Sequence, residues 1–391
     1  MRACESVQNY DSRIREYVNY SYRQSRNVCK NIGKREAGSE NEKQLQQHIK
    51  AELETCADEV ISESFRFSNN RKVLQNKVCA AFILLAFALI MAALLTGIYA
   101  MSYASVAVAV IGIILGFSGK LYSPKKLTTE NVYGVKQSTG VAKNRIILVG
   151  NADCERFTKL ISPFLKAMSI FSAVIIIAVS AIVIVQNMGI VSILPEKYYS
   201  YASIVICVFS IFNIIGLFGG YCGVSDGANK NLTGSFTSLA VLKFLKDMDI
   251  SFENTEIGVL VTGAHEADMS GAKAFTEKHS DKLKNIPTKV LCLDCLREEN
   301  DLRIVPAKTG SAFAKKIMLC SKQAGSEIDI KGEIKNSDAE AFAKTGVEAC
   351  TITASPSSEK AEDTYEDMKI KTIETTLKCV METVFELDSE A

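Results

Sequence analysis

The apolar positions of this chain form long uncharged runs and shorter periodic patterns. Three stretches, residues 78–119, 167–195 and 198–225, contain no Asp, Glu, Lys or Arg. A membrane-spanning helix needs about 20 predominantly apolar residues, so the first stretch is long enough for two spans. The other two stretches supply one span each, at residues 167–186 and 201–220. The pattern therefore predicts four spans, arranged as two hairpins.

Shorter patterns between these runs predict a sheet covered by helices. Residues 145–150 (RIILVG) form a continuous apolar run, which is typical of a strand buried on both faces. The other predicted strands are residues 59–67, 131–135, 257–262, 289–294 and 349–353, and the main predicted helices are residues 41–57, 235–246, 271–278, 339–345 and 367–387. Alternation of helices with buried strands predicts an α/β fold, an α/β/α sandwich with a mixed sheet.

The charged residues change this picture, because they are confined to the predicted soluble part. All 45 Lys+Arg and all 44 Asp+Glu lie outside the three uncharged stretches, and the net charge is +1. No long basic run provides a phosphate-binding patch, so we expect no nucleic acid partner. The predicted spans also contain no ionisable side chain of the kind that usually marks a transport pathway. A transporter or channel is therefore disfavoured.

Basic residues flank the two hairpins mainly on one side. They are Arg71, Lys72 and Lys77, then Lys120, Lys125 and Lys126, then Lys159 and Lys166, whereas the opposite turns contain only Lys197. The positive-inside rule then predicts a multi-pass membrane protein whose soluble domain faces the cytoplasm. The soluble domain is expected to comprise residues 1–77, 120–166 and 221–391, with hairpins inserted at residues 78–119 and 167–220.

The twelve cysteines agree with a reducing compartment, because their spacing shows no disulfide framework. Cys292 and Cys295 form a CxxC pair, but no second pair and no nearby histidine accompanies it. Two thiolates alone do not complete a zinc site. We therefore interpret this pair as part of a buried strand.

Polar side chains follow three of the predicted strands. They are Asn151 and Asp153, then His265 and Glu266, and finally Asp294. A glycine-containing polar loop at residues 226–234 also precedes a predicted helix. Ligands of open α/β sheets bind at the carboxyl ends of the strands, so we expect these segments to converge at one edge.

Six segments also match a set of known motifs in chain order. They are residues 32–40 (IGKREAGSE), 145–153 (RIILVGNAD), 227–234 (GANKNLTG), 262–275 (TGAHEADMSGAKAF), 337–349 (SDAEAFAKTGVEA) and 359–364 (EKAEDT). These segments resemble the motifs of the co-catalytic zinc aminopeptidases, whose fold group includes glutaminyl cyclases and the transferrin receptor ectodomain. The resemblance covers nearly all of the soluble chain and implies a zinc-exopeptidase fold.

The resemblance also identifies positions where this sequence departs from the family. The family binds two zinc ions through two His, a bridging Asp, a Glu and an Asp, and uses a further Glu as general base. Asn151 stands at the first His position and Lys230 at the bridging Asp position. His265 stands at the general-base position, and Glu359 stands at the last His position. These replacements predict that the zinc pair is lost.

Three positions keep the residue type that the family motif implies. Glu266 and Asp294 correspond to metal ligands, whereas Asp153 corresponds to the residue that orients the ligand His and now lacks that histidine. We hypothesise that the Lys230 ammonium replaces the metal charge and neutralises Glu266, Asp294 and Glu359.

Two functions remain open from the sequence. The leading one is a membrane-anchored, zinc-aminopeptidase-like protein without dizinc catalysis and without a cofactor, which acts as a binding or scaffold module for a peptide or protein partner. The alternative is an active membrane metallopeptidase with an altered zinc site. In that case Glu266, Asp294 and Glu359 hold the metal, and His265 acts as the base.

Overall fold

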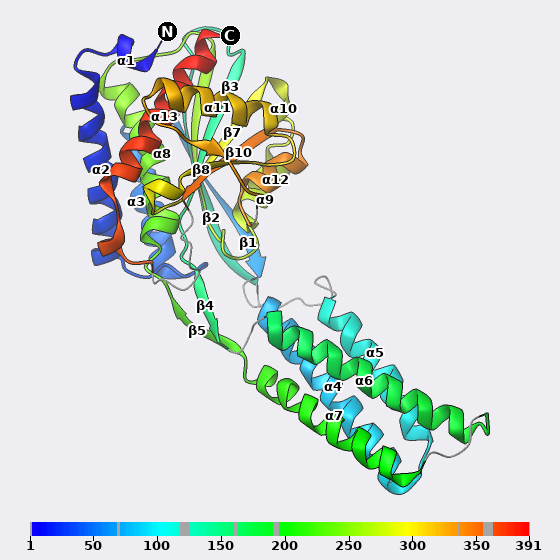
Figure 1. Cartoon of the computed structure of the whole chain (residues 1–391). Helices are drawn as coiled ribbons and strands as arrows, with labels where there is room; N and C mark the ends of the chain where they lie inside the picture. Colours follow the sequence, from blue (N-terminus) through cyan, green and yellow to red (C-terminus); the bar gives the residue numbers. More distant parts are fainter. Residues whose placement is uncertain are drawn as a thin grey trace. The chain divides into compact units, whose positions relative to one another are not determined.

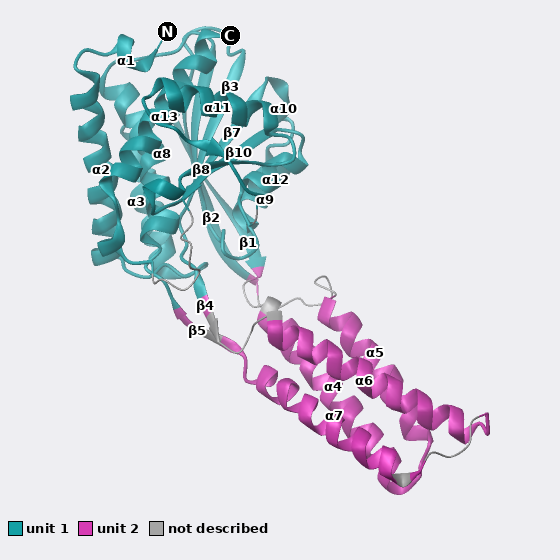
Figure 2. Ribbon diagram, viewed as in Figure 1, with its two compact units in different colours: residues 1–67, 127–156, 224–391 teal, residues 68–126, 157–223 magenta. Residues whose placement is uncertain are grey.

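The computed structural model describes residues 2–68, 71–117, 126–159, 163–190, 195–334, 336–354 and 363–390. The chain divides into two compact units, which Figure 2 shows in different colours. Unit 1 comprises Met1–Phe67, Leu127–Arg156 and Val224–Ala391, and unit 2 comprises Ser68–Lys126 and Phe157–Gly223.

Unit 1 is built on an eight-stranded mixed sheet. In spatial order its strands are β1 (Glu59–Ser68), β2 (Lys126–Lys136), β6 (Thr255–Thr262), β3 (Asn144–Asn151), β7 (Thr288–Leu296), β10 (Glu348–Ala354), β8 (Arg303–Pro306) and β9 (Asp329–Ile330). The four central strands β6, β3, β7 and β10 are parallel, whereas β2 and β8 pair with their inner neighbours antiparallel. The carboxyl ends of the central strands therefore lie at the same edge of the sheet.

Helices cover both faces of this sheet (Figure 1). One face carries α2 (Tyr10–Asn31), α3 (Glu40–Glu54), α8 (Thr233–Asp247), α11 (Ser311–Gln323) and α13 (Ile370–Ser389), and the other carries α9 (Ser270–Lys278), α10 (Lys282–Asn285) and α12 (Ala339–Lys344). A short helix, α1 (Ala3–Ser6), packs near the amino end of α2. The predicted α/β/α sandwich with a mixed sheet is confirmed.

Strand β3 shows why the continuous apolar pattern predicted a central strand. Ile146 and Leu148 belong to the core cluster on one side of the sheet, together with the α8 residue Phe236. Ile147 and Val149 belong to the cluster on the other side. Because neighbouring side chains of a strand point to opposite faces, a strand covered by helices on both sides needs apolar residues at every position.

The amino end of α3 is fixed by a capping box that also reaches the sheet edge. Ser39 Oγ accepts a hydrogen bond from the Glu42 backbone N–H at 3.2 Å, and Glu42 Oε2 accepts one from the Gly38 N–H at 2.6 Å. The second oxygen of Glu42 accepts a hydrogen bond from the Ala264 N–H at 2.9 Å. The start of α3 is therefore tied to the loop that follows β6.

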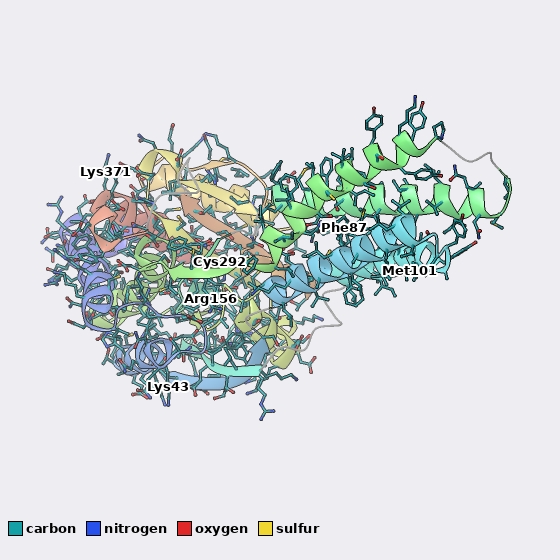
Figure 3. All side chains as sticks on the ribbon, turned by 90° about the horizontal axis from the view of Figure 1, so that it is seen from below. Lys43, Phe87, Met101, Arg156, Cys292 and Lys371 are labelled. Atoms are coloured by element: carbon teal, nitrogen blue, oxygen red, sulfur yellow. The ribbon has the colours of Figure 1, made fainter. Side chains whose placement is uncertain are left out.

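Unit 2 consists mainly of four long apolar helices. They are α4 (Arg71–Thr96), α5 (Ala100–Phe117), α6 (Pro163–Asn187) and α7 (Glu196–Leu217). Among the described residues, each is long and apolar enough to cross a membrane. Figure 3 shows Phe87 and Met101 on these helices, among side chains that are largely carbon. Hydrogen bonding between helices also occurs, since Ser105 Oγ donates to the Ala86 carbonyl at 2.8 Å.

Several elements were not predicted from the sequence. The short strands β8 and β9 and the helix α11 were missed, as was a two-stranded ribbon of β4 (Arg156–Lys159) and β5 (Gly220–Val224). Cys292 and Cys295 lie in β7, as the buried-strand interpretation predicted, and both thiols are free. Residues 359–362 of the last predicted motif lie outside the described residues.

Candidate functional site

The residues singled out in the sequence come together at the carboxyl edge of the parallel strands. Asn151 is the last residue of β3, and Asp294 lies near the end of β7. His265 and Glu266 follow β6, and Lys230 lies on η1 (Ala228–Leu232), a short π-helix that leads into α8. The topology of the sheet therefore places these segments together at one edge.

Asp153 joins two of the loops at this edge. Its carboxylate accepts hydrogen bonds from the backbone N–H of His265 at 2.8 Å and from that of Glu266 at 2.9 Å. Burial raises the pKa of this carboxyl well above its usual range, and the Glu42 and Glu266 carboxylates add to the effect. Asp153 therefore holds two backbone groups in place at a position where the family motif has a residue that orients the ligand His.

Lys230 lies between two carboxylates. Its Nζ is 3.0 Å from Glu266 Oε1 and 3.0 Å from Glu155 Oε2. Burial opposes the charge on this ammonium, but the carboxylates of Glu266, Glu155 and Asp294 outweigh burial and raise the pKa of Lys230. The ammonium therefore stays charged at neutral pH.

His265 makes a buried pair with Asp338. His265 Nδ1 is 2.8 Å from Asp338 Oδ1, and the two side chains are 4% and 3% exposed. Burial alone would lower the pKa of His265, but the Asp338 carboxylate and its hydrogen bond raise that pKa to about 10. Thr262 Oγ1 donates to the second Asp338 oxygen at 2.7 Å. The imidazole is therefore held as an imidazolium at neutral pH.

Asn151 is engaged by a second amide. Its Oδ1 accepts a hydrogen bond from Asn231 Nδ2 at 2.8 Å, and Asn151 is only 3% exposed. The backbone carbonyl of Asn151 also accepts a hydrogen bond from Ser235 Oγ at 2.8 Å. These contacts fix the end of β3 against the η1–α8 segment with neutral groups.

Asp294 is a buried carboxylate that lacks a hydrogen-bond donor for one of its oxygens. Burial raises its pKa to about 6, although His265 and Lys230 favour its charged form. Its buried Oδ1 accepts no hydrogen bond from any residue that the structure describes. Asp294 thus has a buried carboxylate oxygen without a hydrogen-bond donor among the described residues.

The backbone around Lys230 is held by Asp363. The two oxygens of Asp363 accept hydrogen bonds from the Asn229 N–H at 2.9 Å and from the Lys230 N–H at 3.0 Å. Gly227, just before η1, has φ +58°, and a Cβ there would lie 2.9 Å from an Arg35 nitrogen. The predicted motif residue Glu359 lies outside the described residues.

Two residues that the structure adds to the site, Asp338 and Glu155, were not predicted from the sequence. Asp338 lies within the fifth matched motif, so a signal existed, although the motif did not suggest a pairing with His265. Glu155 lies just beyond the second matched motif, and its contact with Lys230 joins positions 75 residues apart. Only the folded chain reveals that contact.

The described residues at this edge do not by themselves provide the ligands of a zinc pair. Zinc sites use about four ligands drawn from His, Cys and carboxylates. Within the described ranges, no group of three or more His, Cys, Asp and Glu side chains has an arrangement that suits a metal ion. A charged ammonium also contacts Glu266, which is one of the two retained ligand types. The donor set of this cleft therefore differs in kind from that of a dizinc site.

Comparison with known families gives one match within the chain. Residues 217–384 match the profile of peptidase family M28. This segment includes η1, the loop after β6, Asp294 and Asp338. No curated protein sequence matches the chain.

Solved structures extend the similarity to most of the chain. The zinc aminopeptidase BSAP from Bacillus subtilis is 12% identical and has a TM-score of 0.56, with 95% of each chain covered. A glutaminyl cyclase from Bacteroides thetaiotaomicron is 12% identical at a TM-score of 0.55, with 94% of this chain and 97% of that chain covered. A leucine aminopeptidase precursor from the same species is 13% identical and has a TM-score of 0.56, with 94% of this chain and 96% of that chain covered. At this identity the likeness shows a shared fold.

Proposed function

The chain resembles the zinc exopeptidases in sequence motifs and shares their fold, and from this premise we propose that it is a membrane-anchored, peptidase-like binding module without dizinc catalysis. The observation that carries the proposal is the position of Lys230, whose ammonium contacts both Glu155 and Glu266. A peptide or protein is the proposed partner of the cleft.

Electrostatics supports this proposal. Two unit charges 4 Å apart interact by about 4 kcal/mol at an effective dielectric constant of about 20, and a dication doubles that value. A zinc ion beside the Lys230 ammonium would therefore meet a repulsion of about 8 kcal/mol. The ion would also have to displace an ammonium that already neutralises Glu266.

The protonation state of His265 also supports the proposed function. A general base must be unprotonated to take a proton from water. The Asp338 carboxylate and the hydrogen bond to it raise the pKa of His265 to about 10 against the opposing effect of burial, so the imidazole already carries its proton at neutral pH. The residue at the general-base position therefore acts as a second internal cation beside Lys230.

The alternative, an active metallopeptidase with an altered site, has one observation in its favour. Asp294 Oδ1 accepts no hydrogen bond from any described residue, so this oxygen is available as a metal ligand. In this alternative Asp294 and Glu266, with Glu359 from outside the described residues, bind a single zinc ion, and His265 acts as base. Both Lys230 and the protonated state of His265 count against it.

We further propose that the helices of unit 2 anchor the protein in a membrane, with unit 1 on the cytoplasmic side. Four helices of suitable length and apolarity support the anchoring. The basic residues that flank the hairpins support the orientation, because Lys and Arg accumulate on the cytoplasmic side. The partner would then be a cytoplasmic peptide or protein.

Hydrolysis assays on the detergent-purified full chain test the proposal. The substrates are aminoacyl anilides and an N-terminal glutaminyl peptide, since the similar structures are named as aminopeptidases and glutaminyl cyclases. We expect no turnover with or without added zinc, against a zinc aminopeptidase as positive control. Turnover that a chelator abolishes would refute the proposal and establish the alternative.

A further inference from the structure

The segments on either side of the second hairpin pair as strands, and the pairing ends at a root formed by Glu155 and Ser225. β4 (Arg156–Lys159) precedes helix α6, and β5 (Gly220–Val224) follows helix α7. Just before β4 and just after β5, the Ser225 N–H donates to the Glu155 carbonyl at 2.9 Å. The hydrogen bond between Ser225 and Glu155 is thus the last backbone contact of this strand pair before the chain reaches the site.

A buried arginine fixes the backbone at this root. Arg35 is fully buried, and its guanidinium donates to the carbonyls of Gly33 at 2.6 Å, Ala152 at 3.1 Å and Asp226 at 2.7 Å. The Cys154 N–H donates in return to the Arg35 carbonyl at 2.7 Å. The incoming and outgoing segments are therefore both attached to the residues that precede α3.

The side chain of Glu155 connects this root to the cleft. Glu155 forms an ion pair with Lys230, and Lys230 contacts Glu266 in the loop after β6. The Lys230 side chain is 27% exposed, the Glu266 side chain 16% and the Glu155 side chain 46%, so the contact with Glu266 is the more shielded from solvent. The side chains of Glu155, Lys230 and Glu266 thus form two consecutive ion pairs, which connect the residue before β4 with the loop after β6.

We propose that the Glu155–Lys230–Glu266 chain is a latch, which couples the occupancy of the cleft to the strand pair β4–β5 at the root of the second hairpin. A primary ammonium that binds Glu266 competes with Lys230, and the displaced Lys230 no longer restrains Glu155. This inference rests on the proposed function, because a metal ion held by Glu266 would displace Lys230 permanently. Through the latch, ligand binding loosens the segment that continues into α6.

A variant with a matched control tests the latch. Glu155→Gln removes one of the two carboxylates around Lys230 and leaves Glu266 in place. Glu374→Gln is the control, because Lys378 also contacts two carboxylates, Glu374 and Asp11, each at 2.9 Å and remote in the fold from the latch. Lys230→Arg, which keeps the charge, serves as the conservative variant.

The measurement is hydrogen exchange, followed by mass spectrometry, of the full chain in detergent micelles. Glu155→Gln should speed the exchange of residues 152–159 and 220–226 about fivefold, as expected for a modest loss of local stability. Glu374→Gln and Lys230→Arg should leave these segments unchanged. Equal exchange in Glu155→Gln and wild type, or an equal increase throughout unit 1, would overturn the latch.

A second experiment, in which a ligand is added, tests the coupling between the site and the strand pair. Leucine amide, a small molecule with a primary ammonium, should speed exchange of the same segments in the wild-type chain and have no further effect in Glu155→Gln. No effect in the wild type overturns the coupling. Zinc is measured in the same preparation: stoichiometric zinc refutes the proposed function, whereas unchanged exchange in zinc-free protein refutes only the latch.

Discussion

In the cleft, side chains that depart from the zinc-peptidase motifs have partners within the chain. The Asn151 amide bonds to Asn231, the Lys230 ammonium contacts Glu155 and Glu266, and the His265 imidazolium pairs with Asp338. Each contact replaces a metal-directed role by a hydrogen bond or an ion pair. Two cationic side chains, those of Lys230 and His265, thus stand at positions where the family motifs have carboxylates.

Asp153 gives the first test at this scale. Asp153→Ala leaves the N–H groups of His265 and Glu266 without their acceptor, and an unsatisfied buried group costs about 1–3 kcal/mol. We expect the free energy of unfolding to fall by about 2–6 kcal/mol. Urea unfolding followed by circular dichroism measures it, because the chain has no tryptophan for fluorescence.

The control for Asp153 is Asp329→Ala, which removes an exposed carboxylate paired with Lys331. Surface ion pairs contribute little to stability, so this variant should unfold like the wild type. If the two variants lose the same stability, the role assigned to Asp153 is wrong.

The His265–Asp338 pair predicts a pH dependence. The pKa of His265 is about 10 in the folded chain, raised by Asp338 against burial, and about 6.5 when unfolded. The stability from this pair is therefore complete below about pH 6.5 and is lost as pH rises toward 10. Between pH 7 and 9 the contribution should fall by about 1.4 kcal/mol per pH unit.

The readout for His265 is the difference between two stability curves, that of the wild type and that of His265→Gln. Cysteines and tyrosines also titrate near this range, but they contribute to both curves. The stability difference should shrink steadily from pH 7 to pH 9. A difference that stays constant would mean that His265 is neutral in the folded chain.

At the scale of elements, the central sheet could be predicted, whereas its short additions could not. β3, β6, β7 and β10 have apolar runs of a length that distinguishes buried strands from loops. β8 has four residues and β9 has two, too few for any periodicity to appear. Their pairing is decided by neighbours in space, which the sequence pattern does not contain.

The packing of α4 against α5 supplies a prediction for unit 2. A Cβ on Gly112 of α5 would lie 2.9 Å from the Phe82 Cβ of α4. Small residues let membrane helices approach closely, so Gly112→Ala should force the helices apart. We expect a lower midpoint temperature in a heating series followed by size-exclusion chromatography of the detergent-purified chain.

Gly216→Ala is the matched control in α7. The nearest heavy atom to its added Cβ would be the Ala80 Cβ, at an ordinary contact distance of 3.6 Å. Because Ala favours helix over Gly, this variant should be neutral or slightly stabilised. Equal losses in both variants would contradict the proposed close approach of α4 and α5.

At the scale of the whole molecule, two hairpins inserted into a peptidase-like domain predict a topology. The first falls between β1 and β2, and the second between β4 and β5. Both termini should face the cytoplasm, while the turn near residues 188–190 should face the opposite side. Reporter fusions at the C-terminus and in this turn, active only in one compartment, measure the topology. A reporter in the turn that is active in the cytoplasm would contradict it.

The site was predictable in part, for a reason that lies in the whole fold. Sheet topology brings Asn151, His265, Glu266 and Asp294 to one edge, and the order of motifs along the chain contained that information. The Lys230 contact with Glu155 depends on how η1 and the root of β4 pack together, and no local pattern encodes it. The pairing of Lys230 with Glu266 was hypothesised from the motifs, whereas the pairings of Lys230 with Glu155 and of His265 with Asp338 were not.

The central claim is that Lys230 and its neighbours have replaced the metal ions of the zinc-exopeptidase cleft. Its most direct test is the zinc content of the detergent-purified full chain after incubation with zinc and desalting, measured by mass spectrometry of the metal. The wild type should retain well under one zinc per chain, and the Asn151→His, Lys230→Asp double variant should retain more. One or more tightly bound zinc ions per wild-type chain would contradict the account.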